Sequence, residues 1–133
     1  MKRVTGIGGI FFKSENPDQL YSWYEKHLGI AREPYGASFE WLEVRSADGT
    51  EPGPKGATAW SIFPATTKYF GESKSGFMVN YRVDNLDALL EELKQSGVKV
   101  DPHREEAEYG RFAWITDPDG NRIELWEPPK EKK

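Results

Sequence analysis

The chain has 133 residues, enough for one compact domain, and its five Trp, six Tyr and seven Phe supply a core of large side chains. It contains no cysteine, which excludes disulfide frameworks, thiolate metal sites and a cysteine nucleophile. The net charge of −4 comes without the basic cluster that a nucleic-acid partner requires, and no stretch approaches the ~20 apolar residues of a membrane span. We therefore expect a cytoplasmic protein with neither a nucleic-acid nor a membrane partner.

The first predicted elements are a β-rich run at residues 9–13 and a helix that begins after Asn16. Pro17 occupies the first helical position and Gln19 the capping-box position, so the helix start is well defined. Up to Gly29, the side chains that recur with helical spacing are Leu20, Trp23, Tyr24, His27 and Leu28. This pattern predicts an amphipathic helix of about three turns.

The same pattern returns in the second half of the chain. A β-rich run at residues 78–83 precedes Asn85, and a second helical pattern continues to Gly97 with Asp87 in its first turn. A shift of 69 positions maps Asn16 onto Asn85, Leu20 onto Leu89, Tyr24 onto Leu93, Ile10 onto Val79 and Phe12 onto Tyr81. The agreement of strand, cap and helix face indicates an internal repeat.

Further strands are predicted after each helix. They cover residues 39–44, 57–63, 111–116 and 122–126, and a turn at Asp117–Gly120 joins the last two. Each half is therefore predicted to be a βαβββ module, within a single α+β domain that spans residues 1–133. Module 1 covers about residues 4–64, a linker covers 65–76, and module 2 covers about 77–127. Together they form a curved mixed sheet with the helices outside.

Alternation along the strands divides their side chains between two faces. The residues expected to pack beneath the helices are Ile10, Phe12, Val79, Tyr81, Val83, Ile123 and Leu125. The opposite face carries Gly9, Phe11, Lys13, Met78, Asn80, Arg82, Arg122, Glu124 and Trp126. This mixture of aromatic, amide and charged groups is typical of a ligand cavity, although a solvated sheet face is an alternative. The facing of Trp41, Trp60 and Trp114 stays open between core packing and stacking on a ligand.

Three segments resemble the vicinal-oxygen-chelate superfamily, which includes glyoxalases, bleomycin-resistance proteins and dioxygenases. They are the helix segment Asn16–Gly29, the segment Val83–Asp87 and the segment Asp117–Leu125. With the repeat, the resemblance covers nearly the whole chain, and it implies a glyoxalase-like fold. The resemblance also implies a homodimer and a divalent metal held by His, Gln and Glu ligands from several strands.

The metal ligands of that superfamily are not all matched in this chain. Their positions fall on Gly9, on Met78, near Trp60 or Ser61, and on Glu124. Of these residues, only Glu124 has a side chain of the kind that coordinates a metal, whereas catalytic zinc or iron sites have about three protein ligands. His27 and His103 are expected on a helix away from the cavity and in a loop beside Pro102, respectively. We therefore expect no bound metal and no cofactor.

The favoured hypothesis is a protein that binds a small organic molecule in the cavity of the sheet. The residues expected to bind it are Phe11, Trp60, Met78, Asn80, Arg82, Trp114, Glu124 and Trp126. The alternative is a lyase, isomerase or dioxygenase-type enzyme of the same superfamily, in which Glu124 acts as a base or metal ligand. Two further alternatives are an interaction module without a small ligand, and a Glu124 that only forms an ion pair with Arg82 or Arg122.

Overall fold

The computed structural model describes residues 4–44 and 52–130 and contains one mixed sheet with two helices. In chain order the elements are β1 (Val4–Ser14), α1 (Pro17–Leu28), β2 (Ala37–Val44), β3 (Pro52–Pro64), β4 (Phe77–Val83), α2 (Leu86–Gln95), β5 (Lys99–Ala107), β6 (Gly110–Thr116) and β7 (Arg122–Glu127). The seven strands have the order β2-β3-β1-β4-β7-β6-β5. This architecture confirms the predicted α+β, glyoxalase-like class.

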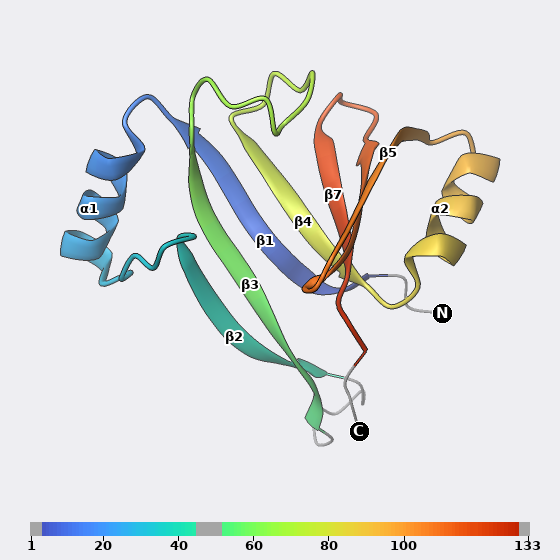
Figure 1. The fold of residues 1–133 in the computed structure, drawn as a ribbon, viewed down its shortest axis with the longest axis horizontal. Coiled ribbons are helices and arrows are strands. Elements are labelled where there is room, and N and C mark those ends of the chain that lie inside the picture. The colour runs from blue at the N-terminus through green and yellow to red at the C-terminus, as the bar shows by residue number, and fades with distance from the viewer. Residues whose placement is uncertain (1–3, 45–51, 131–133) are drawn as a thin grey trace.

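The internal repeat determines the topology of the sheet. β1 and β4 pair antiparallel at its centre, β1 is parallel to β3, and β4 is parallel to β7. Ile10 and Val79, which the repeat relates, are also direct partners across β1 and β4. The two halves are therefore related by an approximate twofold axis near this pair. Figure 1 shows the strongly twisted sheet, with α1 and α2 on opposite sides of the molecule.

Both helix starts have the predicted caps. The Asn16 side chain accepts a hydrogen bond from the backbone N–H of Gln19 at 3.2 Å, and Asn85 accepts one from Ala88 at 3.1 Å. The first helix ends at Gly29, whose positive φ of 70° favours glycine. None of the helices in the described ranges is long and apolar enough to cross a membrane.

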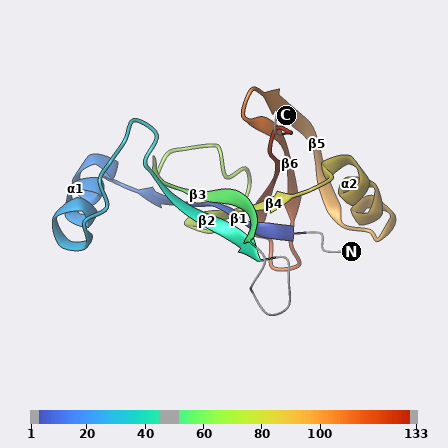
Figure 2. The same ribbon diagram turned by 90° about the horizontal axis from the view of Figure 1, so that it is seen from below.

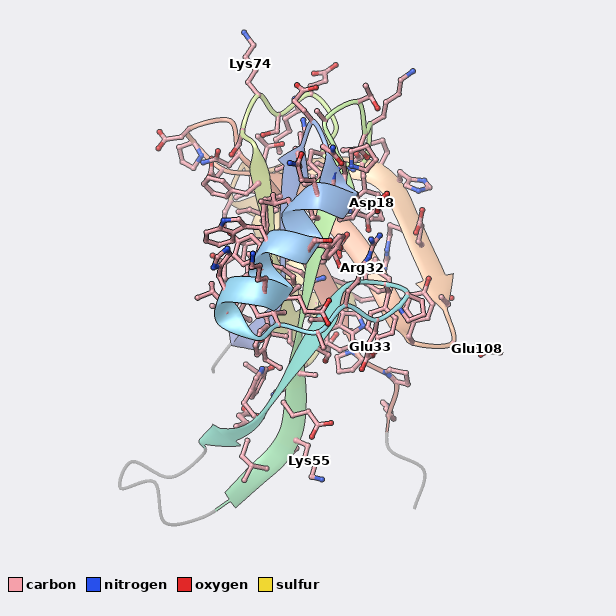
Figure 3. The ribbon with its side chains drawn as sticks, turned by 90° about the vertical axis from the view of Figure 1, so that its left-hand side faces the viewer. Asp18, Arg32, Glu33, Lys55, Lys74 and Glu108 are labelled. Atoms are coloured by element: carbon pink, nitrogen blue, oxygen red, sulfur yellow. The ribbon has the colours of Figure 1, made fainter. Side chains whose placement is uncertain are left out.

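Each helix covers one end of the sheet with its apolar side. α2 buries Leu86, Leu89 and Leu90 against Val83, Ala113 and Leu125. α1 buries Tyr21 against Ala37, Trp60 and Ile62. An exposed ion pair between Asp18 and Arg32 at 2.7 Å joins α1 to the loop that follows it, as the side chains in Figure 3 show.

The linker at residues 65–76 folds back onto the sheet on the side away from the helices. Phe70 of this linker is fully buried, and it packs against Phe11, Met78 and Trp114. Tyr69 stacks on Phe63 with ring centroids 5.5 Å apart. Figure 2 shows the linker over one part of the sheet while β5 and β6 rise beside it. The linker and the second half of the sheet thus border a concave space.

Two local predictions need correction. Ile10 is 40% exposed instead of packed beneath a helix, because the helices lie toward the two ends of the sheet. His103 lies in strand β5, which the sequence analysis did not predict, and not in a loop. β5 is an edge strand with mostly exposed side chains, so it lacks the apolar alternation of a half-buried strand. Among the described residues the first half contributes three strands and the second half four.

Candidate functional site

A cavity of about 570 Å³ opens on the concave side of the sheet. We call it the Glu124 cavity, because Glu124 is the charged residue in its lining. Its six aromatic side chains are Phe11, Tyr35, Tyr69, Tyr109, Phe112 and Trp126. Its other lining residues are Gly8, Ser38, Ala57, Ala59, Ser61 and Asn80. The site is thus an aromatic enclosure with a few polar groups and one carboxylate.

The register of three strands places Glu124 and its hydrogen-bond donors together. Glu124 on β7 lies opposite Asn80 on β4 and Trp114 on β6. Asn80 donates from Nδ2 to Glu124 Oε1 at 2.6 Å, and Trp114 donates from Nε1 to Oε2 at 3.0 Å. The Tyr69 hydroxyl, from the linker, donates a third hydrogen bond to Oε2. Three neutral donors therefore hold a carboxylate that is only 2% exposed.

Burial is the main electrostatic influence on Glu124. Desolvation raises the pKa of the Glu124 carboxyl, and the hydrogen bonds from Tyr69, Asn80 and Trp114 oppose that rise. The negative charge of Glu105 raises this pKa further. Burial and the neighbouring Glu124 carboxylate also raise the pKa of Tyr69, so its hydroxyl stays protonated and donates. Within the described residues, Glu124 forms no ion pair.

Asn80 is fixed between Glu124 and the backbone of β1. Its Oδ1 atom is buried and has no hydrogen-bond partner among the residues that the structure describes. A Cβ atom added at Gly8 would overlap this oxygen and lie 3.0 Å from the Trp126 ring. Glycine at position 8 therefore allows β4 and β7 side chains to pack directly on the β1 backbone.

A second cleft shares Ala57, Tyr109 and Trp126 with the Glu124 cavity. It is bordered by Arg82, whose Nη2 atom lies 2.8 Å from Glu43 Oε2. Arg82 also donates from Nε to Thr5 Oγ1 at 2.7 Å and from Nη1 to the Lys55 carbonyl at 3.3 Å. Its guanidinium lies 4.7 Å from the centroid of the Trp41 ring. These contacts commit Arg82 to a buried network within the protein.

The structure brings together four of the eight residues predicted to bind a ligand. Phe11, Asn80, Glu124 and Trp126 all line the Glu124 cavity. Strand alternation placed these four on one face, and the curvature of the sheet gathers them around one space.

The other four residues lie elsewhere, so their predicted placement in the cavity is corrected. Trp60 packs beneath α1 against Tyr21, because β3 turns this ring toward the helix. Met78 is buried in the aromatic cluster beneath the linker. Trp114 is buried behind Glu124 and reaches it only through its indole N–H. Arg82 faces the neighbouring cleft and is held by Glu43.

The structure also contradicts an ion pair between Glu124 and either arginine of its sheet face. Arg82 pairs with Glu43, and Arg122 Nη1 pairs with Asp101 at 3.1 Å. The partners of Glu124 are instead the neutral donors described above.

Sequence reasoning missed four aromatic side chains of the cavity: Tyr35, Tyr69, Tyr109 and Phe112. Tyr69 is the most important, because it contacts Glu124 directly from the linker. The only local signal was the pair Tyr69–Phe70 within a stretch that is otherwise rich in Thr, Ser and Lys. Two adjacent large aromatics in a polar linker suggest that the segment is packed on a core.

The residues present do not form a metal site of the kind that the superfamily resemblance implies. Within the described ranges, no group of three or more His, Cys, Asp or Glu side chains gathers. The β4 residue opposite Glu124 is Asn80, which turns its amide N–H toward the carboxylate, and the β1 residue opposite Asn80 is Gly9. Both Glu124 oxygens already accept hydrogen bonds. A metal would therefore find one carboxylate, whose neighbours are donors and not ligands.

Comparison with known proteins connects this geometry to one large family. A sequence model described as Glyoxalase/Bleomycin resistance protein/Dioxygenase superfamily matches residues 6–125. A 58-residue stretch is 34% identical to the uncharacterized protein YraH of Bacillus subtilis (strain 168), and it covers 42% of this chain and 45% of YraH. The match therefore spans less than half of that relative.

Two solved structures illustrate the likeness of the fold. Methylmalonyl-CoA epimerase from Mycobacterium tuberculosis superposes with a TM-score of 0.64 at 21% identity, over 98% of this chain and 92% of the epimerase. A Mn(II)-bound glyoxalase from Novosphingobium aromaticivorans gives a TM-score of 0.57 at 17% identity, over 100% of this chain and 43% of that protein. At these identities the likeness concerns the fold alone.

Proposed function

Because the chain belongs to the Glyoxalase/Bleomycin resistance protein/Dioxygenase superfamily, we propose that it binds a small organic molecule in the Glu124 cavity, with Glu124 as its polar anchor. The observation that carries this proposal is a buried carboxylate in an aromatic cavity of about 570 Å³. This volume lies within the range of small-molecule sites, and apolar walls with a few convergent polar groups are their usual composition.

The proposal is tested by filling the cavity. The protein is purified gently and its native mass spectrum is recorded, and ligand candidates from a small-molecule library are then ranked by thermal shift. Ala59→Leu places a larger side chain in the cavity lining, so it should abolish binding. Ala88→Leu on the exposed side of α2 is the matched control and should bind normally. A wild-type protein that carries no copurified molecule and responds to no library compound would contradict the proposal.

A second candidate is an enzyme of lyase, isomerase or dioxygenase type in which Glu124 acts as a general base. The observation in its favour is the burial that raises the pKa of the Glu124 carboxyl and makes it a stronger base. The three hydrogen-bond donors oppose this effect, so binding is the preferred proposal. Deuterium exchange into carbon acids in D₂O, followed by NMR, tests the alternative. Exchange that is catalysed by the wild type and lost in Glu124→Gln would favour the enzyme.

We also propose that the site works without a metal ion. The support is the donor set around Glu124, in which Tyr69, Asn80 and Trp114 offer hydrogen atoms to the carboxylate. Zinc, nickel, iron or manganese should therefore leave the melting temperature unchanged. A clear stabilisation by one of these metals, abolished by Glu124→Ala, would overturn this proposal.

A cytoplasmic homodimer is the expected state of the protein. Its support is the exposure of large apolar side chains on the central strands, where Ile7 and Ile10 of β1 and Phe77 of β4 are 45%, 40% and 59% exposed. Two copies that cover these side chains would remove apolar surface from water. Sedimentation that finds only a monomer of 15.2 kDa at tens of micromolar would contradict the homodimer.

A further inference from the structure

We propose that the ligand of the Glu124 cavity is an organic cation, an alkylammonium or arylalkylammonium that carries at least one N–H. This inference rests on the proposed function, because it names the chemical class of the molecule that the same cavity binds.

The lining of the cavity is negatively charged. Over residues 4–44 and 52–130, the lining contains no basic residue, and Glu124 contributes a negative charge. The nearest arginines of the same sheet face are committed elsewhere, Arg82 to Glu43 and Arg122 to Asp101. Glu105 on β5, which pairs with the cavity residue Phe112, adds a second negative charge. A cation is therefore attracted to this cavity and an anion is repelled.

The negative charge of the Glu124 carboxylate is only partly compensated by its neighbours. Buried charges are normally paired with an opposite charge, because burial removes the water that stabilises them. Tyr69, Asn80 and Trp114 supply hydrogen bonds to Glu124 but no positive charge. Among the residues that the structure describes, Oε1 accepts only from Asn80, so it retains capacity for one more donor. An ammonium N–H supplies both the missing charge and that donor.

The aromatic walls of the cavity also favour a cation. The faces of Trp, Tyr and Phe rings attract cations through their quadrupoles, and cages of several aromatic rings are a recurrent arrangement for binding organic ammonium groups. Six aromatic side chains line this cavity. The binding free energy of a neutral molecule of the same shape would come from the burial of its apolar surface alone. An organic cation would add favourable interactions with the aromatic rings and with the carboxylate.

Three probes of similar shape test the charge preference. Isothermal titration calorimetry at pH 8 compares 3-phenylpropylammonium, 3-phenylpropan-1-ol and 3-phenylpropanoate. We expect the ammonium to bind the wild type at least about tenfold more tightly than the alcohol, because it adds a charge-assisted hydrogen bond and cation–π contacts. The carboxylate should bind most weakly. In Glu124→Gln the preference for the ammonium over the alcohol should disappear.

A second variant keeps the test independent of the buried network. Glu105 is 52% exposed and does not touch Glu124, so Glu105→Gln should fold normally. It should lower the affinity for the ammonium about twofold at low salt and leave the alcohol unchanged. Glu25→Gln, which makes the same charge change on the exposed side of α1, is the matched control and should alter neither affinity.

The outcomes separate this inference from the proposed function. If the alcohol binds as tightly as the ammonium, the cation is excluded as the preferred ligand but small-molecule binding survives. If none of the probes binds, a copurified ammonium compound in the native mass spectrum supports the inference, and a copurified neutral or anionic compound overturns it. If no probe binds, no molecule copurifies and no library compound shifts the melting temperature, both the inference and the proposed function fail.

Discussion

Two buried carboxylates on the concave side of the sheet have opposite surroundings. Glu43 on β2 is 5% exposed and is held by the guanidinium of Arg82. Glu124 on β7 is 2% exposed and is held by neutral donors from Tyr69, Asn80 and Trp114. Both are equally removed from water, yet only Glu43 has an opposite charge in contact.

The different partners of the two carboxylates indicate that Glu43 belongs to a structural ion pair and Glu124 to a candidate binding site. The guanidinium of Arg82 neutralises Glu43 and also bonds to Thr5 and the Lys55 carbonyl, so the network is complete within the protein. Glu124 instead lines an aromatic cavity, and none of its three hydrogen-bond donors carries a positive charge. The charge of Glu43 is therefore compensated within the protein, whereas Glu124, held by neutral donors beside a cavity, is the candidate for contact with a ligand.

The largest expected effect comes from removing the cation of the first pair. Arg82→Met removes a guanidinium that bonds to the buried Glu43 carboxylate, to Thr5 and to the Lys55 carbonyl, so the free energy of unfolding should fall by about 3–5 kcal/mol. Urea denaturation measures this loss. Arg32→Met is the matched control, because Arg32 pairs with Asp18 at the surface, with side chains 42% and 84% exposed (Figure 3). It should cost less than about 1 kcal/mol.

Restoring an apolar pair should reverse most of the loss. The double variant Arg82→Met with Glu43→Leu removes both charges of the pair and should recover stability, because the buried carboxylate that lost the Arg82 guanidinium is replaced by an apolar side chain. Equal losses of unfolding free energy in Arg82→Met and Arg32→Met would show that the buried pair contributes no more to stability than the exposed pair.

A smaller loss is expected when β1 is crowded beside Asn80. Gly8→Ala would push its methyl group into Asn80 Oδ1 and toward Trp126, and so displace the Asn80 N–H from Glu124. Overpacking of this kind typically costs about 1–3 kcal/mol. Gly76→Ala is the control, since a Cβ there meets nothing within 4 Å. Thermal unfolding should give a lower melting temperature for Gly8→Ala than for Gly76→Ala. Similar melting temperatures would show that glycine at position 8 is not needed for the packing of Asn80.

Removal of the Tyr69 hydroxyl tests the contribution of the linker. Tyr69→Phe deletes one of two donors to Glu124 Oε2 and leaves Trp114 on that oxygen. The expected loss is about 1.5 kcal/mol, the lower end for a hydrogen bond to a charged group. Tyr35→Phe removes a hydroxyl that contacts the exposed Glu33, so it should scarcely change stability. If the two variants are equally stable, Tyr69 does not hold Glu124.

The sequence predicts the local parts of this molecule well. Asn16 and Asn85 cap the helices as expected, because a cap depends on residues three positions away. The inward facing of Asn80 and Glu124 follows from strand alternation, which is also a local property. The repeat then predicts that the two modules share one sheet.

The sequence could not identify the partners within the site. Tyr69 and Glu124 are 55 positions apart, and Arg82 and Glu43 are 39 apart, so neither contact leaves a periodic pattern. Alternation placed Arg82 and Glu124 on one face but could not tell that each would meet a different neighbour. The facing of Trp60 stayed open between core and ligand for a similar reason, since the facing of β3 depends on turns whose geometry the residues alone do not determine.

The smallest expected effect is on the pH dependence of stability, compared between wild type and Glu124→Gln. Because burial raises the pKa of Glu124 above its ordinary value of 4.5, the folded protein holds a proton that the unfolded chain has released in the window just above pH 4.5. The stability from this proton is complete below that window and is lost as pH rises through the folded pKa. The slope is at most about 1.4 kcal/mol per pH unit for one group.

The Glu124→Gln variant has no titratable group at this position. As pH rises through this window, the wild type should therefore lose stability relative to the variant. The variant should still fold, because the Asn80 amide can flip and accept a hydrogen bond from the new amide N–H. Asp87, Asp101 and Asp117 have lowered pKa values and stabilise the fold as pH rises, but they are present in both proteins and cancel in the difference. Urea denaturation from pH 4 to 8 measures this difference. A difference that stays constant over that range would mean that Glu124 titrates alike in the folded and unfolded chains, and that its burial beside neutral donors does not perturb it.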